Sequence, residues 1–175
     1  MMIRPADKQR EFRGAEALAR RLCLPPLHAT LIVGYGNDLR SDDGAGVLVA
    51  KKVAAQSPQA RVLVAHQLTP DLADDIARVA HVIFVDAYAA PVSGAALRIE
   101  RIAEDPAGDV PAFGHHMAPG TLVHLAKRLY GTQTEAWVLG VPAYCFVAGE
   151  KLSPETLNRI DEAVALIGGR AFSDN

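Results

Sequence analysis

The sequence lacks the features that mark membrane, exported and nucleic-acid-binding proteins. No uninterrupted apolar stretch reaches the ~20 residues that a membrane-spanning helix requires, and the N-terminus has no hydrophobic core of a signal peptide. Long runs of Lys and Arg are absent, and the formal net charge is -2. Proteins that bind nucleic acids or membrane surfaces require clustered positive charge. We therefore expect an unexported protein whose partner is another protein or a small molecule.

Cysteine is also scarce. Cys23 and Cys145 are far apart, and neither belongs to a CxxC motif or to a Cys/His spacing typical of metal sites. A disulfide framework is therefore not expected, and two reduced thiols are typical of the cytoplasm. The sequence predicts a cytoplasmic protein.

Motifs of three enzyme classes are missing. In the first glycine-rich turn, Gly34 and Gly36 are followed by Leu39 where a dinucleotide-binding GxGxxG motif has its third glycine. The phosphate-binding GxxxxGK[ST] motif and the GxSxG nucleophile elbow do not occur, and neither cysteine is next to a plausible base. Any hydrolysis would have to use an activated water molecule.

The sequence does contain alternating strand-like and helix-like segments after residue 28. In a chain of 175 residues with 50% hydrophobic content, this pattern predicts a single α/β domain with a mostly parallel sheet and helices on both faces. We interpret the Arg-rich residues 1–27 as an N-terminal extension, either flexible or in contact with the partner, and residues 28–175 as the domain. Strands are expected from residue 31 and at 60–68, 81–86 and 137–141, with an edge or antiparallel strand at 95–102.

Helices are expected at about residues 43–55, 71–79, within 115–130 and at 154–167. Thr69 and Ser153 are the candidate hydroxyl caps, Pro119 belongs to a first turn, and Gly131 suits a left-handed C-cap. Two apolar helix faces are predicted, and their members are Val47, Ala50 and Ala54 on the first helix and Leu122, Leu125 and Leu129 on the third.

Two acidic positions and a histidine are predicted to meet at the carboxyl edge of the sheet. Asp42 and Asp43 follow the first strand, Asp86 ends the third, and His115 precedes a later helix. In open α/β sheets this edge forms the ligand crevice. Asp43, Asp86 and His115 would together provide an oxygen-rich ligand set that suits Ni, Fe, Zn or Mn.

Each of these residues also has a structural interpretation. Asp42 or Asp43 alone is equally explained as a helix cap, and Asp86 could belong to an Asx turn. Isolated histidines in loops are more often solvated than ligands, and His116 suits the role of His115 equally well by composition. The remaining histidines, which we interpret as structural or solvated, are His66, His81 and His124.

The order of these motifs resembles a known family. GYGNDLRSDDGAG is followed by HQLTPDLADDIARVAHVIFVDA, HHMAPGTLVHLAKRLYG and GVPAYCFVAGEKLSP. Together they are similar to the hydrogenase maturation endopeptidases, over roughly residues 29–167. The resemblance implies a twisted α/β sheet flanked by helices. It also implies a peptidase that removes the C-terminal extension of the precursor of a nickel-iron hydrogenase large subunit after nickel insertion.

The resemblance also implies roles for particular residues. The metal-site residues of the family correspond to Asp43, Asp86 and His115, and the catalytic acids would be Asp43 and Asp86. Asp42 then becomes the structural member of the acidic pair. His115 fits the motif better than His116. Nickel would be carried by the precursor, and the resting enzyme could be metal-free. The general base stays open, and a non-enzymatic nickel-binding checkpoint or chaperone for hydrogenase assembly is the alternative.

Overall fold

The structure, a computed structural model, describes residues 27–91, 93–102 and 117–168. Residues 1–26 lie outside these ranges, so the interpretation of residues 1–27 as an extension stays a prediction. The strands are β1 (Thr30–Tyr35), β2 (Arg61–Ala65), β3 (His81–Ala89), β4 (Arg98–Arg101) and β5 (Glu135–Ala143). The helices are η1 (Leu27–Ala29), η2 (Ser41–Gly44), α2 (Ala45–Gln56), α3 (Leu72–Ala77), α4 (Pro119–Tyr130) and α5 (Pro154–Gly168).

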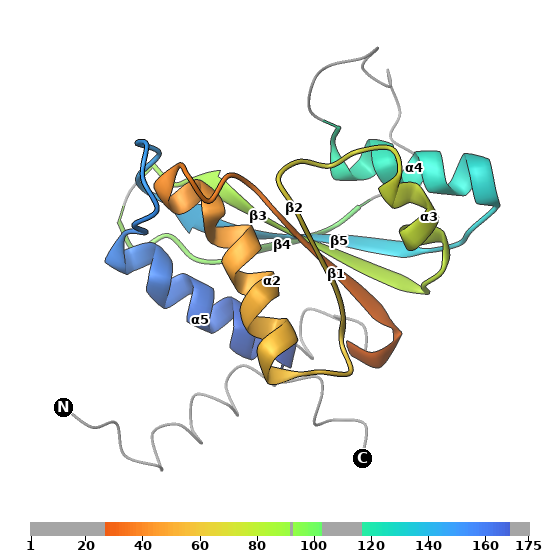
Figure 1. Ribbon diagram of the computed structural model, residues 1–175, viewed down its shortest axis with the longest axis horizontal. Helices are drawn as coiled ribbons and strands as arrows, with labels where there is room; N and C mark the ends of the chain where they lie inside the picture. Colours follow the sequence, from red (N-terminus) through yellow and green to blue (C-terminus); the bar gives the residue numbers. More distant parts are fainter. Residues whose placement is uncertain (1–26, 92, 103–116, 169–175) are drawn as a thin grey trace.

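The strands form one sheet in the order β2-β1-β3-β5-β4. All neighbouring pairs are parallel except β4 with β5, which is antiparallel. Helices α2 and α5 cover one face, and α3 and α4 cover the other (Figure 1). The predicted mostly parallel α/β sheet and the antiparallel edge strand are confirmed.

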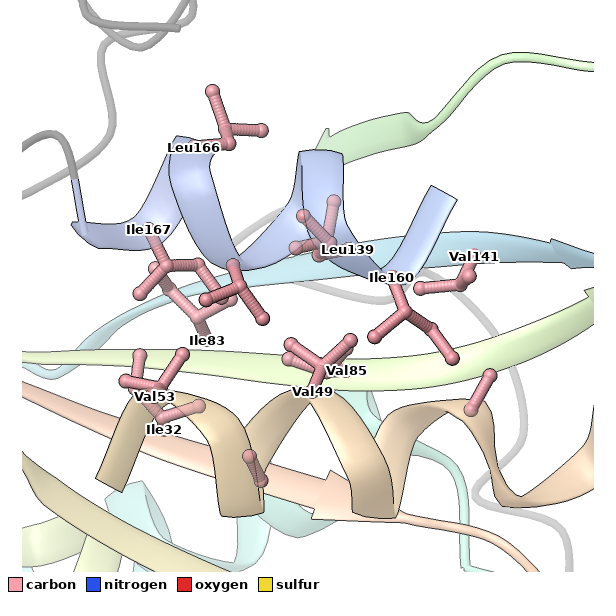
Figure 2. Close-up of a cluster of buried hydrophobic side chains, with 14 of the residues drawn as sticks. Ile32, Val49, Val53, Ile83, Val85, Leu139, Val141, Ile160, Leu166 and Ile167 are labelled. Carbon is pink, nitrogen blue, oxygen red and sulfur yellow. The ribbon is translucent and has the colours of Figure 1, made fainter. Parts of the chain in front are cut away.

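Two hydrophobic clusters fill the space between the sheet and its helices, because successive strand residues point to opposite faces. On β1, Ile32 joins the cluster under α2 and α5, whereas Leu31 and Val33 join the cluster under α3 and α4. Figure 2 shows the first cluster, in which Val49 of α2 and Ile160 of α5 are drawn with side chains from the strands.

Gly46 brings the start of α2 against the sheet. A Cβ atom there would lie 2.2 Å from the carbonyl oxygen of Val85 and 2.5 Å from that of Tyr35, so only glycine fits without movement. The close approach places η2, and with it the acidic pair, beside the ends of β1 and β3.

Several predicted boundaries and contacts are corrected. Strand β3 continues beyond Asp86 to Ala89, and β2 stops at Ala65. No side-chain hydrogen bond caps α3; the backbone carbonyl of Thr69, not its hydroxyl, accepts the N–H of Leu72. The predicted helix start at Asp43 is a 3-10 turn, because regular α2 begins only at Ala45.

The predicted apolar faces are each wrong at one position. Ala54 is exposed, and Val49 and Val53 are buried in its place on α2. Leu129 is 61% exposed, because the whole last turn of α4 from Lys127 to Tyr130 is exposed.

Three end signals are confirmed. Pro119 opens α4, Gly131 ends it with a left-handed φ of 69°, and the Ser153 hydroxyl accepts the N–H of Thr156 at the start of α5. Within the described residues, no helix combines the length and the apolar character needed to cross a bilayer.

Candidate functional site

A cavity of about 520 Å³ lies at the carboxyl edge of β1, β2 and β3. Both predicted catalytic acids line it. The loop between β1 and η2 supplies part of the wall, and the start of α4 supplies another part. The side chains and backbone that line it belong to Tyr35, Gly36, Asn37, Arg40, Asp43, His66, Gln67, Leu68, Asp86, Met117, Ala118 and Pro119.

Asp86 enters the cavity from within β3. Phe84 packs in the cluster under α3 and α4, and strand alternation places Asp86 on that same face. The carboxylate Oδ1 accepts the N–H of Ala87 at 2.8 Å, and the Tyr35 hydroxyl donates a second hydrogen bond to the carboxylate. Burial raises the pKa of Asp86, and the charge of Asp43 adds to this rise, whereas the two hydrogen bonds oppose it. The carboxyl group is therefore a stronger base than an exposed aspartate.

Asp43 reaches the cavity from η2. Its Oδ2 accepts the N–H of Asn37 at 3.3 Å, and the residue is only partly buried. No side-chain hydrogen bond caps α2, so Asp43 is not a helix cap. The structure thus brings Asp43 and Asp86 to one cavity, as predicted from the order of the strands.

Asp42, the preceding residue, points elsewhere and is completely buried. Its Oδ2 accepts the N–H groups of Tyr144 and Cys145 at 2.8 and 2.9 Å and the Ser153 hydroxyl at 2.8 Å; Oδ1 accepts the Ser153 N–H at 2.6 Å. Burial acts to raise the pKa of Asp42, but the hydrogen bonds from Ser153 and Tyr144 outweigh it, and the pKa is lowered. Its predicted structural role is confirmed.

The backbone beside Asp42 is strained. Ser41 has a φ of 51°, the only positive value among the described residues other than glycine. The Ser41 N–H donates to the carbonyl of Gly149 at 2.7 Å, and its hydroxyl donates to the carbonyl of Val147 at 3.1 Å. These bonds and those of Asp42 fix η2 to the loop that follows β5, which holds Asp43 in place at the cavity.

The predicted histidines, His115 and His116, lie outside the described residues. Met117 and Ala118, which follow them directly in the sequence, line the cavity, so the two residues before α4 lie at the site. The choice between the two histidines stays a prediction.

Among the lining residues that were not singled out for the site from sequence are His66, Arg40 and Tyr35. His66 follows β2 and is exposed, which agrees with a solvated histidine, but its place in the cavity was missed. Arg40 was missed because a loop residue gives no periodic signal. Tyr35 could have been found, since it continues the alternation of Leu31 and Val33 beside the strand that carries Asp86.

The two carboxylates of the described site are oxygen donors, and an added imidazole would make this ligand set suitable for a borderline metal ion. Two carboxylates supply oxygen ligands, and the free Cys145 is not among the lining residues. Within the described residues, no three Asp, Glu, His or Cys side chains are grouped closely enough to hold a metal. Further ligands would have to come from outside the described residues or from a bound partner.

No protein-family model matches the sequence, and no curated protein matches it significantly. Solved structures do match the fold. The NiFe hydrogenase maturation protease HycI from Thermococcus kodakarensis is 21% identical, with a TM-score of 0.68 over 89% of this chain and 98% of that one. The hydrogenase maturating endopeptidase HybD from E. coli is 22% identical, with a TM-score of 0.59 over 77% and 86%.

A second protease from Thermococcus kodakarensis, the NiFe hydrogenase maturation protease HybD, is 19% identical, with a TM-score of 0.55 over 81% of this chain and 98% of that one. At these identities the likeness establishes the fold. This chain therefore has the fold of the hydrogenase maturation proteases.

Proposed function

We propose that the protein is an endopeptidase that removes the C-terminal extension from the precursor of a nickel-iron hydrogenase large subunit after nickel has been inserted. The observation that carries this proposal is the convergence of Asp43 and Asp86 on one cavity, against the start of α4. The fold shared with proteins named as hydrogenase maturation proteases supports it.

Nickel is proposed to act as a recognition tag carried by the precursor. Asp43, Asp86 and His115 would contact the ion while the precursor's own cysteines hold it. The two carboxylates have the oxygen donors for such contacts, and open coordination positions would remain for the partner's ligands. The scissile peptide would then lie in the cavity of about 520 Å³.

The proposed chemistry is hydrolysis by water, with Asp43 and Asp86 as the catalytic acids. A carboxylate would take a proton from the attacking water, and the protonated acid would return it to the leaving amine. The raised pKa of Asp86 favours this residue as the base. In the metal-assisted form of the reaction, the precursor's nickel would also polarise the scissile carbonyl.

The test is a cleavage assay with purified precursor in nickel-loaded and nickel-free forms. We expect only the loaded form to lose its C-terminal extension, detected as a mass change. Asp161→Asn is the matched control for substitutions of Asp43 and Asp86, because Asp161 is an exposed aspartate on α5 with a 69% exposed side chain. Binding of the loaded precursor without cleavage under any condition would contradict the peptidase function and favour a nickel-binding checkpoint.

The histidine is tested in the same assay. His115→Ala should abolish processing and His116→Ala should not; the reverse pattern would exchange the two assignments.

We expect processing in the cytoplasm, which cell fractionation of the native protein checks.

A further inference from the structure

Tyr35 is the last residue of β1 and lies beside the strand that carries Asp86. The parallel register pairs Gly34 with Val85, so the next residues along the two strands are Tyr35 and Asp86. Residues in register on adjacent parallel strands point to the same face of the sheet. Both side chains line the cavity, so the phenol and the carboxylate meet at the site.

The phenol ring and its hydroxyl have different surroundings. The ring packs against the hydrophobic cluster under α3 and α4, which fixes its position. The hydroxyl donates a hydrogen bond to the Asp86 carboxylate, and the N–H of Ala87 donates to Oδ1 of the same group. Asp86 is therefore held from a neighbouring strand as well as from its own backbone.

We propose that Tyr35 is a positioning residue, whose hydroxyl holds the Asp86 carboxylate in the orientation that contacts the metal. This inference rests on the proposed function, in which Asp86 is a nickel contact. An ionised carboxylate has about four lone-pair sites, so the hydrogen bonds from Tyr35 and Ala87 leave acceptor capacity for the cavity. Without the hydroxyl, only the N–H of Ala87 would hold the carboxylate, and part of the binding free energy would be lost in ordering it.

The test is a calorimetric titration of the full chain with Ni²⁺ alone. Tyr35→Phe keeps the packed ring and removes only the hydroxyl, and the loss of a group that orients a ligand typically weakens metal binding about 10–100-fold. Tyr88→Phe is the matched control, because Tyr88 lies on the same strand as Asp86 and donates its hydroxyl to the carbonyl of Ala96 at 2.7 Å. We expect Tyr88→Phe to bind Ni²⁺ like the unaltered protein.

Three results would overturn the inference. Tyr35→Phe could bind Ni²⁺ as tightly as the unaltered protein, or both tyrosine variants could lose affinity equally. Alternatively, the unaltered protein could bind no more tightly than Asp86→Asn, which would remove Asp86 as a metal contact. The titration requires no precursor, so its outcome is separate from the cleavage assay. A weakened Tyr35→Phe in a protein that never cleaves the precursor would support the positioning role and reject the peptidase.

Discussion

Asp42 and Asp43 are adjacent in sequence and belong to the same turn, η2, but their side chains have different surroundings. Asp42 is completely buried and accepts four hydrogen bonds from the loop after β5 and the start of α5. Asp43 is partly exposed, accepts the N–H of Asn37, and lines the cavity with Asp86. One carboxylate of the pair thus anchors the turn, and its neighbour is left available for chemistry.

The comparison shows why an acidic pair suits this turn. A carboxylate placed at a cavity needs a rigid backbone, and η2 is too short to provide rigidity by itself. The bonds of Asp42 fix η2 to a segment more than one hundred residues later in the sequence. We expect Asp42 to determine stability and Asp43 to determine activity.

The largest expected effect is on activity. Asp43→Asn or Asp86→Asn should slow processing of the nickel-loaded precursor by about 10²–10⁴-fold, because each removes a carboxylate needed for proton transfer or metal contact. The single-turnover rate at saturating enzyme measures this effect. A rate near that of Asp161→Asn would remove the altered residue from the catalytic site.

The next largest effect is on the free energy of unfolding. Asp42→Asn should lower it by about 3 kcal/mol, because buried N–H donors lose a charged acceptor and one now faces an amide N–H₂ group. Asp43→Asn should change it by less than about 1 kcal/mol. Urea unfolding of both variants measures the difference, and equal losses would contradict the separation of roles.

The pH dependence of stability should also separate Asp42 from Asp86. The folded-state pKa of Asp42 is lowered, so its stabilisation is present above the unfolded value of about 3.9 and is lost as the pH falls through the folded value. The advantage of the unaltered protein over Asp42→Asn should therefore shrink below about pH 4.

Asp86 should behave with the opposite sign. Burial raises its folded-state pKa, so ionisation of Asp86 costs stability, and this cost disappears as the pH falls below the unfolded value. Asp86→Asn should therefore be more stable than the unaltered protein at pH 7 while being inactive. Thermal unfolding between pH 3 and pH 8 checks both signs, and an Asp86→Asn variant less stable at pH 7 would contradict the pKa direction.

The smallest effect is expected at Ser41. Ser41→Ala removes the hydrogen bond to the carbonyl of Val147 but keeps the left-handed backbone, at a cost of about 1 kcal/mol. Ser41→Gly loses the same bond but relieves about 1 kcal/mol of backbone strain, and should be nearly neutral. Urea unfolding compares the two, and equal stabilities would show that the φ of 51° is not strained.

Much of this arrangement could be predicted from sequence. The apolar run before Gly34 and the strand ending near Asp86 indicated parallel strands, and the carboxyl-edge rule then brought Asp43 and Asp86 together. Pro119 and Gly131 marked the ends of α4 because each acts through local backbone geometry. These signals are local or periodic, which is why a single sequence carries them.

Contacts between distant segments could not be predicted. The family resemblance assigned different roles to Asp42 and Asp43. No spacing in the sequence, however, indicates that Asp42 bonds to Tyr144, Cys145 and Ser153. Leu129 fitted the helical period and is nevertheless exposed, because periodicity does not show where a helix passes beyond its packing surface. Strand alternation could have placed Tyr35 on the face of Leu31 and Val33, but its position beside Asp86 follows only from the register of β1 against β3.

The separate roles of Asp42 and Asp43 are tested most directly by comparing Asp42→Asn and Asp43→Asn on nickel-loaded precursor, at a temperature where circular dichroism shows both variants to be folded. The measured quantity is the single-turnover rate of release of the C-terminal extension. We expect a rate for Asp42→Asn within about tenfold of the unaltered protein and a loss of about 10²–10⁴-fold for Asp43→Asn. Equal losses in the two variants, or an active Asp43→Asn, would contradict these separate roles.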